Sequence, residues 1–427
     1  MAETSPLDPV EDPLPFASPG DPLVWLRRGD GMVGAGPAVL RLDVAAGPDR
    51  AARLADAWRA VSAAADVRDE VGLPGCGLVG FGAFAFDDSS ALPSTLVVPS
   101  VVVGRRGGRS WVTRIRRADA DARREPGTDP ARAPEPEPYG PHWSATLGPG
   151  RMDPGAHGDA VRAALAAIDE GDVKKVVIAR DIAGTVPAGA DLRRLVRALA
   201  TGYPDTWVFA VDGIVGASPE TLVTVSGGTV TARVLAGTRG RGADADEDTA
   251  ITAELAANHK DLDEHEYAVR SVVDALRPHT SALAAAEQPF TLKLPNLWHL
   301  ATDVEGTLSN GSSALDMVRA LHPTAAVAGT PRDAAMAAIR RIEPFDRGRY
   351  AGPVGWIDAS GDGEWAIALR CAQFARPAPE ARAAGTEGAA TRAVTAHAGG
   401  GIVAGSVPEA ELLETRVKFR PIVDALA

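Results

Sequence analysis

Cysteine, positive charge and long apolar runs are all in short supply in this sequence of 427 residues. The two cysteines, Cys76 and Cys371, do not form a Cys-x-x-Cys pair, which argues against a disulfide framework and a structural zinc site. No apolar run approaches the ~18 residues that a membrane helix needs. The acidic, Pro-rich start lacks the basic residues and apolar stretch of a signal peptide. We therefore expect a cytoplasmic protein without membrane contact.

Acidic residues outnumber basic residues by 56 to 44, so the formal net charge is −12. Such a chain is a poor partner for nucleic acid or for an anionic membrane surface. An anionic small molecule would need a local basic pocket or a metal ion. The hydrophobic fraction of 45% allows a substantial core, in one large domain or in two to three ordinary ones.

The pattern along the chain divides it into four segments. Residues 1–22 are expected to be a loose N-terminal segment. Residues 23–117 contain short strands and a helix at 49–66, and they are expected to complete the sheets of the remainder. Residues 118–150 are rich in Pro and charge, which is typical of a flexible linker. The stronger signals lie in 151–427.

In this last segment, strands follow strands and helices lie between the groups, which favours an α+β architecture. The periodicity predicts one long helix over 249–277 and a closing helix over 409–426. A hairpin is expected to turn at 360–363. The low-complexity stretch 376–391 is most simply a long hairpin loop.

Two acidic pairs, Asp261/Glu264 and Glu411/Glu414, stand at i, i+3 spacing within segments predicted to be helical. This spacing puts both carboxylates of a pair on one helix face. Two such faces across one cleft would suit a hard divalent cation, most simply Mg²⁺. Acidic pairs on helices are more often solvated faces. The neighbouring Gly-rich and His-bearing segments, which suit an anionic small molecule, favour the metal site.

Nine short segments carry a family resemblance. They are KVVIAR (175–180), VGASPE (215–220), LAGTRGR (235–241), KDLDEH (260–265), LHPTAAVAGTP (321–331), YAGPVGW (350–356), ALRCAQ (368–373), AGGGIV (398–403) and ELLETRVKF (411–419). Their order resembles that of the chorismate-binding enzymes, which include isochorismate synthase, salicylate synthase, anthranilate synthase component I and aminodeoxychorismate synthase component I. The resemblance covers roughly 150–425 and far less of the N-terminal part. It implies one large domain of layered antiparallel sheets with helices outside, in which 151–427 is the chorismate-binding catalytic region.

The resemblance assigns catalytic roles to Lys175 and Glu220. Lys175 resembles the residue that activates water, and Glu220 resembles the general acid that protonates the departing C4 hydroxyl of chorismate. Water would attack C2, the double bonds would shift, and the C4 oxygen would leave. Taken alone, Lys175 is typical of a snorkelling side chain at a strand start, and Glu220 of a polar turn residue.

The resemblance also implies a Mg²⁺ site on the acidic pairs. Glu264 and Glu414 would be direct ligands, and Asp261 and Glu411 would act through bound water, which Mg²⁺ readily keeps. Family members often have Glu where Asp261 stands, and Asp is shorter. The bound ion would offset the repulsion of the substrate carboxylates.

The substrate carboxylates would need further donors. Arg370 could pair with one of them in a bidentate manner, and glycines let backbone N–H groups approach an anion closely. The expected substrate-binding residues are His299, Tyr350, Arg370, Gly399, Gly400, Gly401, Lys418, Gly237 and Thr238.

Ala236 stands where aminodeoxychorismate synthases carry a Lys nucleophile, so that activity ranks low. The leading hypothesis is an isochorismate synthase, an isomerase that needs no obligatory protein partner. The alternative is a salicylate synthase, which forms isochorismate and then eliminates pyruvate. Anthranilate synthase component I ranks third, because Lys175 argues against ammonia as the nucleophile. A catalytically silent binding module disagrees with the acid, base and metal positions. Siderophore and menaquinone synthesis both remain open as the pathway.

Overall fold

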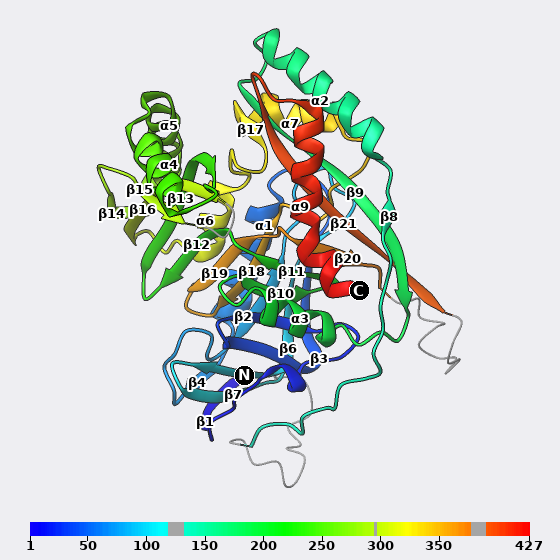
Figure 1. The fold of residues 1–427 in the computed structure, drawn as a ribbon. Coiled ribbons are helices and arrows are strands. Elements are labelled where there is room, and N and C mark those ends of the chain that lie inside the picture. Colours follow the sequence, from blue (N-terminus) through cyan, green and yellow to red (C-terminus); the bar gives the residue numbers. More distant parts are fainter. Residues whose placement is uncertain (118–131, 294–296, 377–389) are drawn as a thin grey trace.

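The computed structural model describes residues 1–117, 132–293, 297–376 and 390–427, apart from the side chains of Thr238, Lys260, Glu264 and Leu297. All 21 strands of these ranges are joined in one hydrogen-bonded sheet. The pairings there are antiparallel, with the exception of β1 and β4. Helices lie outside the strands (Figure 1). The expected α+β fold of antiparallel sheets in a single large domain is confirmed.

The elements follow one another along three stretches of the chain. The first stretch contains β1 (Ala2–Leu7), the 3₁₀ helix η1 (Leu14–Phe16), β2 (Leu23–Arg27), β3 (Asp30–Val44), α1 (Arg50–Ala63), β4 (Val67–Asp69), β5 (Val79–Ala83), β6 (Ser94–Arg106) and β7 (Arg109–Ile115). The second contains β8 (Gly148–Pro149), α2 (Pro154–Asp169), β9 (Lys175–Pro187), α3 (Arg193–Gly202), β10 (Trp207–Val211), β11 (Ile214–Ser218), β12 (Thr221–Ser226), β13 (Thr229–Gly240), α4 (Ala245–Ala257), α5 (His259–Leu276) and η2 (Arg277–His279). The third contains β14 (Thr280–Ala285), β15 (Phe290–Lys293), β16 (Leu297–Leu308), α6 (Ala314–Leu321), β17 (Gly329–Thr330), α7 (Arg332–Ile342), β18 (Pro353–Asp358), β19 (Gly363–Ile367), β20 (Cys371–Phe374), β21 (Thr391–Val403) and α9 (Pro408–Leu426).

Local sequence signals explain several of these boundaries. Gly107 and Gly108 both have positive φ and turn the chain between β6 and β7, because glycine adopts this conformation without a steric penalty. Asp153 caps α2 by accepting a hydrogen bond from the Ala156 N–H, and Pro154 occupies the first turn. The hairpin expected at 360–363 is the turn between β18 and β19.

The N-terminal region joins the same sheet as the rest of the chain. β2 pairs with β10, and β5 pairs with β18. The expectation that residues 1–22 are loose is wrong. Residues Ala2 to Leu7 form β1, which pairs with β7 and leaves Ala2 and Thr4 buried. The Thr4 hydroxyl lies 2.8 Å from that of Thr113, 109 residues later, so a distant partner and not the local pattern creates this strand.

The described part of the expected linker, residues 132–150, is irregular but anchored. The Ala145 N–H donates to the Leu426 carbonyl at 2.8 Å, and the Trp143 indole N–H donates to the Asp191 carbonyl at 2.9 Å. These bonds hold it against the C-terminal helix and the start of α3, in contrast to a flexible linker. Residues 118–131 lie outside the described ranges, as does most of the stretch 376–391.

The single helix expected over 249–277 is also wrong. Asn258 has an extended conformation (φ −77°, ψ 109°) that separates α4 from α5, and its side chain accepts the Asp261 N–H. An N-cap residue needs this non-helical backbone, and Asn is among the best caps. None of the helices in the described ranges is long and apolar enough to cross a membrane.

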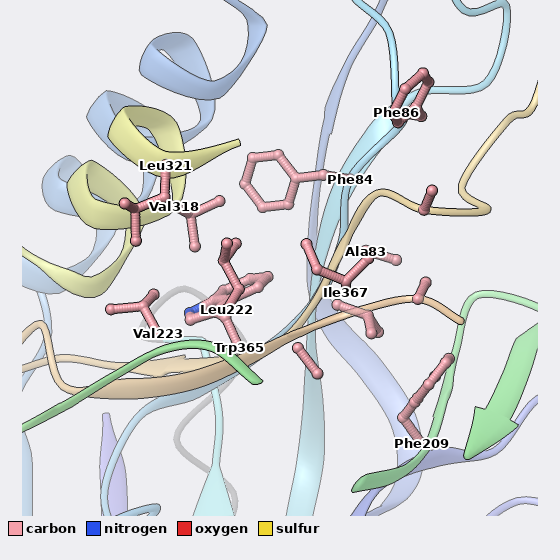
Figure 2. Close-up of a cluster of buried hydrophobic side chains, with 14 of the residues drawn as sticks. Ala83, Phe84, Phe86, Phe209, Leu222, Val223, Val318, Leu321, Trp365 and Ile367 are labelled. Atoms are coloured by element: carbon pink, nitrogen blue, oxygen red, sulfur yellow. The ribbon is translucent and has the colours of Figure 1, made fainter. Parts of the chain in front are cut away.

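A hydrophobic cluster supports the strands that carry the site. Figure 2 shows Trp365 close to Leu222 of β12, with Val223 and the aromatic ring of Phe84 in the same cluster. Trp365 and Phe84 meet edge to face with ring centroids 5.4 Å apart, an arrangement that aromatic pairs favour. The ends of β12 and β19 are therefore fixed by a close-packed core.

Candidate active site

Lys175 is the first residue of β9 and pairs with Val403 of β21 on one side and Thr330 of β17 on the other. A Cβ atom on Gly401 would lie 2.9 Å from Lys175 Cε and 3.6 Å from Nζ. Glycine at position 401 therefore leaves the space that the Lys175 side chain occupies.

Glu220 lies in the short turn between β11 and β12, and neighbouring strands fix its backbone. Its N–H donates to the Ser218 hydroxyl at 3.2 Å, and its carbonyl accepts the Ile367 N–H at 3.0 Å. The Ser218 hydroxyl in turn donates to the Ile367 carbonyl at 2.5 Å. Ser218 was not identified from the sequence, although it belongs to the segment VGASPE.

The electrostatic surroundings of Glu220 bring four of the predicted residues together. Burial raises the pKa of Glu220, and the positive charges of Lys175, Arg370 and Lys418 oppose this rise. The net pKa is above the ordinary value, which favours the protonated form that a general acid needs. These residues come from β9, the β11–β12 turn, the β19–β20 connection and α9, so sheet pairing assembles the cluster.

Arg370 and Tyr350 lie within electrostatic reach of each other. Arg370 adopts a left-handed conformation with φ +50°, which is uncommon for a residue with a side chain and concentrates at functional sites. Burial lowers the pKa of Arg370, against the opposing influence of Tyr350, Glu220 and Glu414. Burial also raises the pKa of Tyr350 to about 12, so its hydroxyl keeps its proton and can donate a hydrogen bond.

His299 and Gly237 meet where β13 and β16 pair irregularly. Gly237 has φ +73° at the point where the register shifts, and Thr238 pairs with His299. Burial lowers the pKa of His299, a hydrogen bond with the Gly237 backbone opposes this, and the charges of Lys175 and Lys418 lower it further. His299 is therefore neutral near pH 7 and lies within electrostatic reach of Lys175. The Thr238 side chain lies outside the described residues.

The acidic pair on α9 faces the glycines of β21. A Cβ on Gly400 would lie 2.6 Å from Glu411 Oε2 and 3.7 Å from Glu414 Oε1. Lys418 forms an ion pair with Glu414 and donates to the Gly399 carbonyl at 2.8 Å. Burial, which is the largest influence, raises the pKa of Glu411.

Glu411 also carries a feature that suits a cation. Its Oε2 atom is buried and accepts no hydrogen bond from the residues that the structure describes. A buried carboxylate oxygen without a partner is costly. Carboxylate oxygens are the ligands that Mg²⁺ prefers, so Glu411 and Glu414 fit the expected ion.

The other acidic pair lies on α5. Asp261 is buried and forms an ion pair with Arg239 of β13 at 2.5 Å. Glu264 lies one turn further along α5, and its side chain is not described. Among the side chains that are described, no three of His, Cys, Asp or Glu are grouped closely enough to hold a metal ion. The two acidic pairs stand on separate helices, α5 and α9. The role of Asp261 in metal binding stays a prediction.

The sequence did not predict a buried ion pair that holds β9. Glu343 and Arg347 have side chains that are 1% and 2% exposed. Arg347 donates to the Val177 carbonyl at 2.8 Å, and Glu343 accepts the Ala179 N–H at 2.8 Å. Both bonds reach β9, which begins at Lys175. Their i, i+4 spacing is the one signal that was available in the sequence.

The comparison with known proteins agrees with this geometry. The family model described as "Chorismate binding enzyme" matches residues 23–427, so the chain belongs to the chorismate-binding enzymes. Isochorismate synthase DhbC of Bacillus subtilis (strain 168) is 40% identical over 286 residues, which cover 64% of this chain and 68% of DhbC. Isochorismate synthase EntC of Escherichia coli (strain K12) is 36% identical over 257 residues, which cover 59% of this chain and 62% of EntC. The crystal structure of DhbC from Bacillus anthracis has a TM-score of 0.71 at 29% identity, and the match covers 97% of this chain and 98% of that one.

Proposed function

We propose that the protein is an isochorismate synthase, which converts chorismate reversibly to isochorismate. The observation that carries the proposal is the cluster of Lys175, Glu220, Arg370 and Lys418. It offers a base, an acid with a raised pKa and two cations for a substrate with two carboxylates. The names of the relatives support the same activity. The alternative, a salicylate synthase, finds no support in these relatives.

In the proposed reaction, Lys175 accepts a proton from water as the water oxygen bonds to C2. The ring double bonds shift, and the C4–O bond breaks as Glu220 donates its proton to the leaving hydroxyl. One water enters and one water leaves, so the net reaction is an isomerisation. The reverse reaction exchanges the acid and base roles, because Lys175 is then protonated and Glu220 ionised.

Arg370, Tyr350 and His299 would orient the substrate. A guanidinium can bind a carboxylate through two parallel hydrogen bonds, and the neutral Tyr350 and His299 side chains can add uncharged donors. Holding the ring in one orientation between acid and base would supply a large part of the acceleration.

Mg²⁺ would be held by Glu414 and Glu411, together with Glu264 and Asp261 of α5. When bound, the ion would neutralise negative charge on a substrate carboxylate. The protein's own contribution is to present oxygen ligands beside Gly400, where the lack of a side chain leaves room for them.

The proposal is tested by incubating the purified protein with chorismate and Mg²⁺ in ¹⁸O-labelled water and separating the products by chromatography. Isochorismate with one ¹⁸O at C2 would support both the activity and water as nucleophile. Unlabelled isochorismate would exclude external water as the nucleophile. Salicylate with pyruvate, or anthranilate on addition of ammonium, would replace the proposed activity by that of a different family member. Lys175→Ala and Glu220→Gln serve as matched inactive controls.

A further inference from the structure

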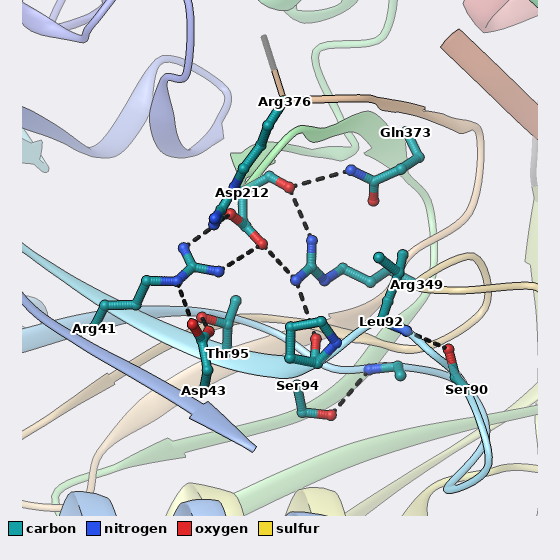
Figure 3. A network of polar contacts seen from close by, with 12 residues as sticks. Arg41, Asp43, Ser90, Leu92, Ser94, Thr95, Asp212, Arg349, Gln373 and Arg376 are labelled. Carbon is teal, nitrogen blue, oxygen red and sulfur yellow. Dashed lines mark hydrogen bonds and ion pairs between the residues drawn. The ribbon is translucent and has the colours of Figure 1, made fainter. Parts of the chain in front are cut away.

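A network of polar contacts surrounds the buried Asp212 and includes Arg349 (Figure 3). Arg349 directly precedes Tyr350 in the chain. The Arg349 guanidinium is 2% exposed. It donates to the Asp212 backbone carbonyl at 2.8 Å and to the Pro93 carbonyl at 3.1 Å, and it pairs with the Asp212 carboxylate at 2.5 Å. Arg349 therefore holds the segment that carries Tyr350 at three points.

Asp212 is the residue on which the network converges. Arg41 donates to both of its carboxylate oxygens at 2.9 Å, and Arg376 also pairs with it. Burial alone would raise the pKa of Asp212, but the hydrogen bond from Arg41 and the charge of Arg349 bring it well below its ordinary range. The carboxylate is thus ionised at any pH at which the enzyme works.

The position of Asp212 in the chain gives it a second connection to the site. It stands in the turn between β10 and β11 with φ +51°, and β11 leads from this turn to Glu220. The Asp212 carbonyl also accepts a hydrogen bond from the Gln373 side chain of β20 at 3.2 Å. β20 follows Arg370 directly and pairs with β11.

Three segments that carry Tyr350, Glu220 and Arg370 therefore meet at Asp212. We propose that Asp212 is a positioning residue for chorismate binding, which acts through Arg349 on Tyr350 and does not touch the substrate. This inference rests on the proposed function. Loss of the carboxylate would leave the buried Arg349 guanidinium without its counter-charge, so this side chain would have to rearrange. Even a displacement of about 1 Å at a binding residue has large effects on turnover.

The first test compares Asp212→Asn with Asp43→Asn in the full-length protein. Asp43 is a matched control from the same network, since it accepts hydrogen bonds from Arg41 at 2.7 Å and Thr95 at 2.6 Å. The contacts described for it do not include Arg349. We expect KM for chorismate to rise by about tenfold or more in Asp212→Asn, to recover partly in Asp212→Glu, and to stay unchanged in Asp43→Asn. A lower Tm with an unchanged KM in Asp212→Asn would mean that Asp212 serves stability alone and would overturn the proposal.

A second experiment tests the proposal even if the Asp212→Asn variant does not fold. Arg349→Met keeps the length of the side chain and removes its charge, and it is measured alone and together with Tyr350→Ala. If Arg349 acts through Tyr350, the rise in KM caused by Arg349→Met will disappear when Tyr350 is already truncated. Additive effects in the double variant would overturn the proposal. A wild-type protein that forms no isochorismate would instead refute the proposed function, so the two failures are distinguishable.

Discussion

Substitution of two neighbouring glycines in β21 by alanine should produce two different defects. A Cβ on Gly400 would lie 2.6 Å from Glu411 Oε2, and a Cβ on Gly401 would lie 2.9 Å from Lys175 Cε. Ordinary contacts of this kind begin at 3.4 Å. Gly400→Ala must therefore displace the Glu411 oxygen by about 0.8 Å, and Gly401→Ala must displace the Lys175 side chain by about 0.5 Å.

The first displacement concerns the proposed metal site, and the second concerns the proposed proton acceptor. Mg²⁺ requires near-ideal octahedral geometry at about 2.0–2.1 Å, and disturbed ligand support typically costs about 10–100-fold in metal affinity. We therefore expect Gly400→Ala to raise the Mg²⁺ concentration for half-maximal activity by about 10–100-fold, or about 1.4–2.7 kcal/mol. We expect Gly401→Ala to lower kcat by about 100-fold with unchanged Mg²⁺ dependence. Both displaced side chains are only half-buried, so they can move without unfolding the protein.

The assay is a Mg²⁺ titration of isochorismate formation, accompanied by calorimetric titration of Mg²⁺ without substrate. The calorimetry separates metal affinity from turnover, and Tm monitors folding. If both variants keep the wild-type Mg²⁺ dependence, the α9 carboxylates do not bind the ion. If both show the same loss of kcat and the same Mg²⁺ dependence, the glycines are needed for the strand itself and not for two separate groups.

Four further predictions concern individual side chains. Glu220→Gln should keep Mg²⁺ binding by calorimetry but lose about 10²–10⁴-fold in kcat, because only the proton donor is removed; near-normal turnover would refute its role as the acid. In the wild type, turnover of chorismate should fall as pH rises through the pKa of Glu220, because the ionised carboxylate cannot donate a proton. This pKa lies above its ordinary value of 4.5. A pH–rate profile without this decrease would contradict the assignment of Glu220 as the acid. Glu264→Ala and Glu414→Ala should each weaken activation by Mg²⁺, and unchanged dependence in both would mean that the acidic pairs are solvated helix faces. Glu343→Gln should destabilise the protein by about 3–5 kcal/mol, since it leaves the buried Arg347 charge unpaired, whereas Glu343→Gln combined with Arg347→Met should recover part of the loss in denaturant unfolding.

Sequence patterns that span a few residues were sufficient to predict much of the fold. The glycine pair at 107–108 and the Asp153–Pro154 start of α2 are local signals, and each coincides with the element boundary that the structure shows. Asn258 is a different case, because Asn is compatible with a helix interior as well as with a cap. The break between α4 and α5 at Asn258 depends on how the chain turns there. The spacing of hydrophobic residues along the sequence does not reveal this turn.

The contacts that could not be predicted from the sequence join residues that lie far apart in the chain. Arg349 reaches Asp212 across 137 residues, and Arg347 reaches Val177 across 170 residues. Each of these arginines is an ordinary charged residue in the sequence, and its burial follows only from the assembled sheet. The family resemblance predicted catalytic roles for Lys175 and Glu220 because both stand in segments that match the family, whereas Arg347 and Arg349 lie outside those segments.

The charge balance of the site gives a physical reason to expect a metal ion. In the proposed reaction, Lys175 must be uncharged to accept a proton and Glu220 must be protonated to donate one. Of the other described charges in the cluster, Arg370 and Lys418 are offset by Glu411 and Glu414, so the formal sum is zero. Chorismate brings two negative charges into this partly desolvated place, where uncompensated charge is costly. A divalent cation held by the acidic pairs would supply the missing two positive charges directly at the substrate carboxylates, through the oxygen ligands that Mg²⁺ prefers.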